Sequence, residues 1–104
     1  MDLKEFEISL EQGHLRSKKI LTKKADEYAR YGTDRLVQFR KLAIITNSNK
    51  AEACVSLMSK HFSSVCDMAH RPNEFTLKQW REKITDLRNY THLLDALVEE
   101  MLEE

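Results

Sequence analysis

The stretch NKAEACVSLMSKHFSSVCDMAH, residues 49–70, decides the fold of this chain. Its apolar side chains recur alternately every four and every three residues, which is the period of one face of an α-helix. Asn49, followed three residues later by Glu52, has the spacing of a capping box at a helix start. The stretch therefore predicts a helix over 49–70 with the inward row Ala51, Val55, Met58, Phe62, Val65 and Ala69.

A second long helix is predicted downstream, from Thr76 to the C-terminus. Pro72 cannot continue a helix and biases Arg71 away from helical angles, so the preceding helix must end near residue 70. Thr76 and Gln79 repeat the capping-box spacing. The apolar residues alternate in the same way and predict the inward row Leu77, Trp80, Ile84, Leu87, Thr91, Leu94, Val98 and Met101.

Two further helices are predicted upstream. Asp2, with Glu5 three residues on, caps a helix that runs to about Tyr28, and Asp34 caps a short helix that ends near Thr46. The first has a poorly amphipathic middle, because His14, Ser17 and Lys24 interrupt its stripe of Leu3, Phe6, Leu10, Leu21 and Tyr28. The short helix has the inward residues Leu36, Phe39 and Ala43.

The composition agrees with an all-α fold. The 104 residues include two Gly and one Pro, too few turn residues for a many-stranded sheet. We expect a single helical domain over residues 1–104, an antiparallel bundle of three long helices and one short helix. A core this small is marginal, and two rows are left over: Leu93 and Leu97 on the last helix, and the half-polar stripe of the first helix. We therefore expect a homo-oligomer, the alternative being that the leftover rows pack on each other.

The charges balance in number but not in position. Seventeen Lys and Arg face seventeen Asp and Glu, so neither nucleic acid nor a membrane is an expected partner. Nine bases and three acids lie between His14 and Lys41, whereas five acids and no base follow from Leu93 onward. We expect the basic stretch of another helix, in the same chain or in a second copy, to face the acidic end.

The cysteines and the N-terminus indicate a soluble cytoplasmic protein. Cys54 and Cys66 are twelve residues apart in one predicted helix, roughly 18 Å along its axis, and cannot pair with each other. The chain begins without an apolar signal region, and its longest apolar run, Leu42 to Ile45, is too short to span a bilayer.

A candidate site lies on the last helix. Glu82, Asp86 and Asn89 share one face, and the same row becomes apolar at Leu93. A row that is apolar at one end is at least partly buried, so its polar end could line a pocket. Two carboxylates one turn apart can share a Mg²⁺ ion, which prefers oxygen ligands. Salt bridges to neighbouring lysines and arginines are the other explanation of this spacing.

The helix over 49–70 offers groups that could face this row. Lys60 and His61 could hold phosphate oxygens, although a histidine between Leu57 and Met68 is also typical of a core position. Asp67 lies near the end of the helix, where a carboxylate opposes the helix dipole. Its position indicates a partner such as Lys60 or a metal ion.

Three segments carry a family resemblance: Lys24-x-x-Glu27-Tyr28-Ala29, Lys60-His61-x-x-Ser64-x-x-Asp67-Met68 and Glu82-Lys83-Ile84-x-Asp86-x-x-Asn89-Tyr90. They resemble small phage and prophage helical proteins related to the MazG-like nucleotide pyrophosphohydrolases. The resemblance implies an oligomeric all-α fold with a nucleotide pocket between helices. In the catalytic members, Glu and Asp from two facing helices hold Mg²⁺, which directs water onto a phosphate and releases pyrophosphate.

The resemblance implies roles for particular residues. Glu82 and Asp86 would be catalytic metal ligands, with Asp67 as a further ligand. The nucleotide-binding residues would be Lys24, Glu27, Tyr28, Lys60, His61, Asn89 and Tyr90. The catalytic members carry a Glu-x-x-Glu pair on the facing helix, where this chain has Lys60, His61, Ser64 and Asp67, so it offers fewer carboxylates for a cation.

The sequence therefore predicts a nucleotide-binding protein of phage or bacterial origin, with Mg²⁺-dependent nucleoside triphosphate pyrophosphohydrolysis as its activity. The alternative is a non-catalytic helical oligomer that sequesters a nucleotide signal or blocks a host protein. A structural bundle without a ligand is a third interpretation.

Overall fold

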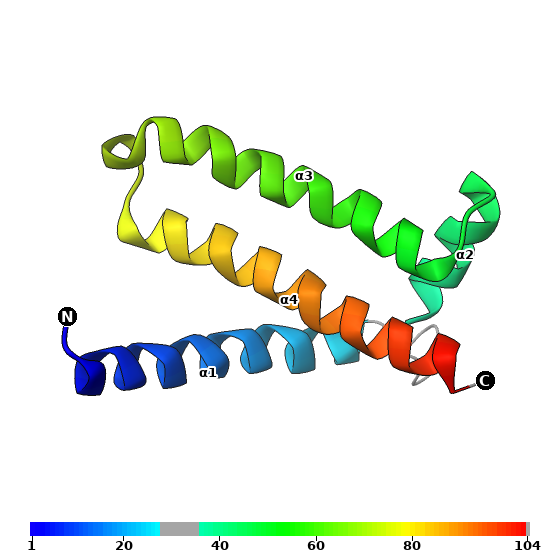
Figure 1. Cartoon of the computed structure of the whole chain (residues 1–104), viewed down its shortest axis with the longest axis horizontal. Helices are drawn as coiled ribbons and strands as arrows, with labels where there is room; N and C mark the ends of the chain where they lie inside the picture. The colour runs from blue at the N-terminus through cyan, green and yellow to red at the C-terminus, as the bar shows by residue number, and fades with distance from the viewer. Residues whose placement is uncertain (28–35, 104) are drawn as a thin grey trace. The chain divides into compact units, whose positions relative to one another are not determined.

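The computed structural model describes the backbone of residues 1–27 and 36–103 and the side chains of residues 1–22 and 36–103. The chain divides into two compact units, residues 1–33 and 34–104. The described residues are all-helical and contain no strand. The elements are α1 (Leu3–Glu27), α2 (Val37–Thr46), α3 (Lys50–His70), the 3₁₀ turn η1 (Pro72–Glu74) and α4 (Leu77–Leu102), shown in Figure 1.

The predicted helix starts are confirmed where the capping residues are described. The Asp2 Oδ1 accepts a hydrogen bond from the Glu5 N–H at 2.8 Å, directly before α1. Both later capping boxes form, Asn49 with Glu52 at the start of α3 and Thr76 with Gln79 at the start of α4. Each box satisfies two donors that a helix end would otherwise leave unpaired.

The start of α2 is less well explained by the sequence. The helix begins at Val37, and the preceding Leu36 makes no side-chain capping bond. The predicted cap, Asp34, lies outside the described residues. The helix ends at Asn47 in the left-handed region, at φ 51°, which Asn tolerates better than most residues.

The core of the second unit lies where α2, α3 and α4 meet. Phe39, Cys54 and Leu97, one from each helix, are completely buried, as predicted for Phe39. Figure 1 shows α3 and α4 side by side, joined through η1. The Cys54 Sγ donates to the Tyr90 carbonyl oxygen at 3.6 Å, so the start of α3 lies beside the later half of α4. Packed around the core are Leu36, Leu57, Tyr90, Leu93 and Leu94.

The inward row predicted for α3 is wrong at several positions. Val55 is 41% exposed and Phe62 is 58% exposed, and Ala69 is also exposed. The buried residues of α3 are Ala53, Cys54 and Met68. The helix is turned by about one residue, or about 100°, because α4 packs on the neighbouring row, which is also mostly apolar.

The inward row predicted for α4 needs the same correction. Ile84, Thr91 and Val98 are exposed, whereas Leu97 is completely buried. Leu97 therefore belongs to the core, and Leu93 packs against that core. The two leucines are not a leftover apolar row, and they no longer support the expectation of an oligomer.

The connection between α3 and α4 has its own small cluster. The Trp80 Nε1–H donates to the Pro72 carbonyl oxygen at 3.0 Å, and the Trp80 ring meets the Phe75 ring edge-on, with the centroids 6.4 Å apart. Arg71 lies over the Phe75 ring and pairs with Glu74 at 2.9 Å. These contacts fix the turn that proline introduces.

Candidate functional site

Two of the three segments behind the family resemblance meet in the α3–α4 pair. The imidazole of His61 and the ring of Tyr90 lie with their centroids 4.8 Å apart and their planes tilted by 34°. Both side chains are half-buried. The contact brings the segment that starts at Lys60 next to the segment that ends at Tyr90, two predicted nucleotide-binding stretches that are far apart in the sequence.

Asn89, the residue before Tyr90, is the second notable polar group. It is only 6% exposed, and its Oδ1 accepts no hydrogen bond within the part of the chain that the structure describes. Leaving a buried amide oxygen unsatisfied costs about 1–3 kcal/mol. Thr85, one turn earlier, is 2% exposed. The row predicted to be partly buried is therefore buried at Asn89 as well as at its apolar end.

The three predicted carboxylates differ in exposure and lie on two helices. Glu82 is exposed and Asp86 is half-buried on α4, while Asp67 is exposed on α3. The described residues contain no group of three or more His, Cys, Asp or Glu placed to hold a metal ion. The structure thus does not bring these three carboxylates together as a ligand set for Mg²⁺.

The remaining predicted residues contribute unevenly to this face. Lys60 is exposed beside His61 on α3. Lys24 and Glu27 belong to α1, but their side chains are not described, and Tyr28 lies outside the described residues. Of the predicted nucleotide-binding residues, the structure therefore brings His61 and Tyr90 into contact, and it describes the side chains of Lys60 and Asn89 on the same two helices.

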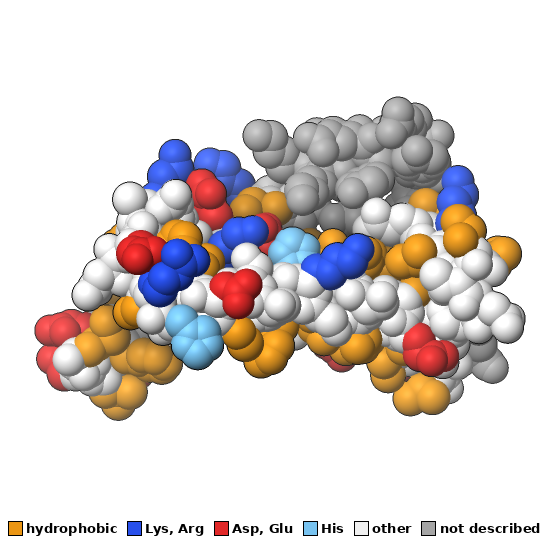
Figure 2. Space-filling view, turned by 90° about the horizontal axis from the view of Figure 1, so that it is seen from above, with side chains coloured by type: hydrophobic (Ala, Val, Ile, Leu, Met, Phe, Trp, Pro, Cys, Tyr) orange, Lys and Arg blue, Asp and Glu red, His pale blue; other side chains and the backbone are white. Residues whose placement is uncertain are grey.

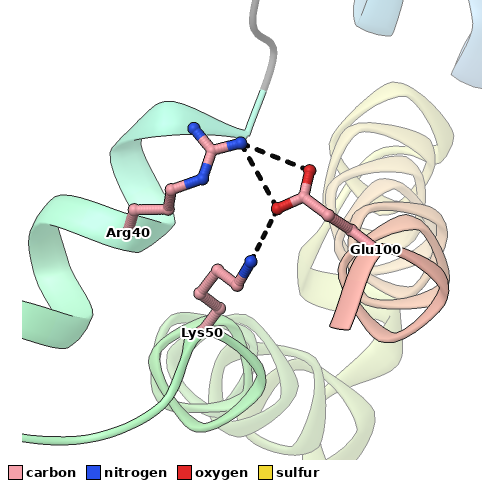
Figure 3. Close-up of polar contacts among 3 residues, drawn as sticks. All are labelled: Arg40, Lys50 and Glu100. Atoms are coloured by element: carbon pink, nitrogen blue, oxygen red, sulfur yellow. Dashed lines mark hydrogen bonds and ion pairs between the residues drawn. The ribbon is translucent and has the colours of Figure 1, made fainter. Parts of the chain in front are cut away.

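Three charged side chains link α2, α3 and α4 where α3 begins and α4 ends (Figure 3). The sequence motifs did not predict this cluster. Arg40 of α2 and Lys50 of α3 both reach the carboxylate of Glu100 on α4. The Lys50 Nζ lies 2.7 Å from Oε1, and the Arg40 Nη2 lies 3.3 Å from Oε1 and 3.2 Å from Oε2. The hydrogen bond from Lys50 and the neighbouring positive charges lower the pKa of Glu100.

The uneven distribution of basic and acidic residues along the sequence indicated such a cluster. Glu100 belongs to the acidic end of the chain, and Arg40 to the basic stretch that was expected to face it. The structure confirms that expectation for Glu100 within one chain. A hollow of about 640 Å³ lies beside the cluster, lined by Arg40, Ala43, Ile44, Asn47, Ser48, Asn49, Lys50 and Met101.

A smaller hollow of about 340 Å³ is nearly apolar and lies between α3 and α4, lined by Met58, Ser59, Phe62, Leu87 and Thr91. It coincides with part of the row that the sequence placed in the core. Figure 2 shows hydrophobic side chains at the surface among side chains of both charges.

Comparison of the chain with protein-family models, with curated proteins and with solved structures found no match. The resemblance to the MazG-like proteins thus stays a prediction from the motifs. Within the residues that the structure describes, no helix combines the length and the apolar character needed to cross a bilayer.

Proposed function

We propose that this protein binds a phosphorylated nucleotide at the face of the α3–α4 pair formed by Lys60, His61, Asp86, Asn89 and Tyr90. The observation that carries the proposal is the ring contact between His61 and Tyr90, 4.8 Å between centroids, which joins two separately predicted nucleotide-binding segments.

The side chains at this face supply the groups that a nucleotide needs. The half-buried rings of His61 and Tyr90 offer aromatic surface for a base. Asn89 carries an amide whose buried Oδ1 lacks a partner within the described residues, so it can accept from a ring or exocyclic N–H. Lys60 is exposed and directly precedes His61 on α3, and its ammonium group can meet phosphate oxygens as a point charge.

Magnesium-dependent hydrolysis is the second candidate function, favoured by the spacing of Glu82 and Asp86. The two carboxylates lie one turn apart on α4, and Asp86 is half-buried. Two carboxylates with water and substrate phosphates form a common Mg²⁺ environment. Hydrolysis therefore depends on these two residues, whereas nucleotide binding at His61 and Tyr90 does not.

A thermal-shift panel of common nucleotides, with and without Mg²⁺, tests the binding. A nucleotide at about one hundred times its Kd stabilises the folded state by about 2.7 kcal/mol, so a binding nucleotide raises the Tm clearly. His61→Ala is expected to abolish the rise. His92→Ala is the matched control, since His92 is exposed on α4, and it should leave the rise intact. The absence of a rise with every nucleotide contradicts the proposal.

Hydrolysis is measured separately, by release of pyrophosphate from any nucleotide that binds. If the chain is an enzyme, Asp86→Asn loses turnover while helix content by circular dichroism stays unchanged. If neither the wild type nor Asp86→Asn releases pyrophosphate and both bind equally well, the protein sequesters the nucleotide.

A further inference from the structure

The larger hollow is lined only by residues of the second unit, from the end of α2, the turn into α3 and the end of α4. Its volume of about 640 Å³ is within the range of sites that hold small organic ligands. Two of its lining residues, Arg40 and Lys50, are cationic, and none is acidic. The wall of the hollow therefore offers an anion two positively charged groups.

A carboxylate of the same chain holds these two cations together, as Figure 3 shows. The Lys50 Nζ lies 2.7 Å from Glu100 Oε1, and the Arg40 Nη2 lies 3.2 Å from Glu100 Oε2. Glu100 itself does not line the hollow. A guanidinium and an ammonium have more N–H donors between them than one carboxylate can accept. The pair thus has the chemistry to receive a second carboxylate beside that of Glu100.

The start of α3 adds to the attraction for an anion. This helix of 21 residues begins at Lys50 after the Asn49 cap, and both residues line the hollow. The N-terminal end of a helix carries partial positive charge from its aligned peptide dipoles. The Lys50 side chain is only 18% exposed, and limited contact with water strengthens its interaction with a negative charge.

Apolar side chains form another part of the wall. Ala43, Ile44 and Met101 line the hollow together with the two cations. Ile44 is 81% exposed, so a large part of its side chain is in water. A ligand with an apolar body would remove this surface from water, which favours binding. An inorganic anion has no group that could do so.

We propose that this hollow is a binding site for a small carboxylic acid with an apolar body. Its carboxylate lies beside that of Glu100, against Arg40 and Lys50, so that two carboxylates balance two cations among these four groups. Its apolar part covers Ile44 and Met101. The site is separate from the proposed nucleotide-binding face, which is built around His61 and Tyr90.

Hexanoate is the probe, and amide shifts in NMR spectra of the full chain locate it. We expect saturable shifts at Ile44 and at residues 48–50, and none at Phe62, which lines the other hollow. Hexanol has the same carbon chain without the charge and should bind at least about tenfold more weakly, because it loses the charged hydrogen bonds. Inorganic phosphate should also bind at least about tenfold more weakly, because it has no apolar part.

Two neighbouring isoleucines provide a matched pair of variants. Ile44 is 81% exposed and lines the hollow, whereas Ile45 is 79% exposed and does not. Ile44→Glu should weaken hexanoate binding at least about tenfold, because it places a like charge in the hollow. Ile45→Glu should leave binding unchanged. Lys50→Met should also weaken binding, with Lys60→Met as the control for loss of a lysine elsewhere on α3.

Several results overturn the proposal. One is the absence of shifts at Ile44 and residues 48–50, and another is equal weakening by Ile44→Glu and Ile45→Glu. Hexanol or phosphate binding as tightly as hexanoate overturns the assigned ligand class. If circular dichroism shows that Lys50→Met is unfolded, the two isoleucine variants decide, because both positions are exposed.

Discussion

At the scale of single residues, the sequence located the core of α2 well and the core of the other helices poorly. Phe39 and Ala43 were predicted inward and are buried. Cys54 was not assigned to the core, although it is completely buried. A small thiol lies equally well on either side of an apolar row, so only the position of α4 decides its burial.

The two cysteines should differ sharply in reactivity. Both are free, but Cys54 is buried and Cys66 is exposed. Burial raises the pKa of the Cys54 thiol and so disfavours the reactive thiolate. We expect a thiol reagent at pH 8 to label Cys66 quickly and Cys54 at least about tenfold more slowly, as followed by mass spectrometry.

Denaturation supplies the control for this prediction. In urea both thiols are exposed and should be labelled at similar rates. Equal rates in the native protein would contradict the burial of Cys54. The same labelling reports on the core, because the Cys54 Sγ contacts the Tyr90 carbonyl oxygen of α4.

At the scale of elements, helix starts were predictable because capping is local. A box needs only residues three apart, so Asn49 with Glu52 and Thr76 with Gln79 could be identified from the sequence and are found in the structure. The inward rows of α3 and α4 were not predictable in the same way. Both helices have two adjacent apolar rows, and the helical period does not choose between them.

Removal of the α3 cap should destabilise the second unit. The Asn49 Oδ1 accepts from the Glu52 N–H at 2.8 Å, and the Asn49 N–H donates to the Glu52 Oε1 at 3.2 Å. Asn49→Ala loses the first of these bonds, which we expect to cost about 1 kcal/mol. The free energy of unfolding from urea titrations measures the loss.

A matched variant distinguishes the loss of the capping bond from a general sensitivity of α3 to substitution. Ser56 is exposed in the interior of the helix, and Ser56→Ala should change the free energy of unfolding by less than about 0.5 kcal/mol. Equal losses for Asn49→Ala and Ser56→Ala would show that the capping bond does not stabilise the protein.

At the scale of the whole second unit, one carboxylate joins three helices. Glu100 of α4 pairs with Arg40 of α2 and Lys50 of α3, which are fifty to sixty residues away in the sequence. These side chains are partly exposed, so solvent weakens each pair. Their shared contribution is to hold α2 against the end of the α3–α4 pair.

The cluster makes stability depend on pH in a predictable direction. The pKa of Glu100 is lower in the folded state than its ordinary value of 4.5. Its stabilisation is therefore complete above about pH 4.5 and is lost as the pH falls through the lowered value. Glu100→Gln should be less stable than the wild type at pH 7, and the difference should disappear in more acidic solution.

Urea midpoints by circular dichroism between pH 3 and pH 7 measure this difference. Glu99→Gln is the neighbouring control, because Glu99 is exposed and lacks an ion pair within the described residues. It should follow the wild type throughout the range. A Glu100→Gln curve that also follows the wild type would show that the cluster does not contribute to stability.

The candidate site was predictable as segments but not as an arrangement. The motifs around His61 and Tyr90 were identified from the sequence, and the ring contact shows that two of them lie together. The lack of a shared ligand set of Asp67, Glu82 and Asp86 within the described residues was not predictable, because it depends on where each carboxylate lies relative to the contact between α3 and α4.

The sequence by itself determined the all-helical fold, the three long helices with one short one, and the starts of α1, α3 and α4, because periodicity, proline and capping act over a few residues. Only the tertiary structure decided which row of α3 and α4 is buried and which acid meets Arg40 and Lys50. Both outcomes depend on which of two helix faces, about 100° apart, packs better against the neighbouring helices. No local sequence pattern contains that packing energy.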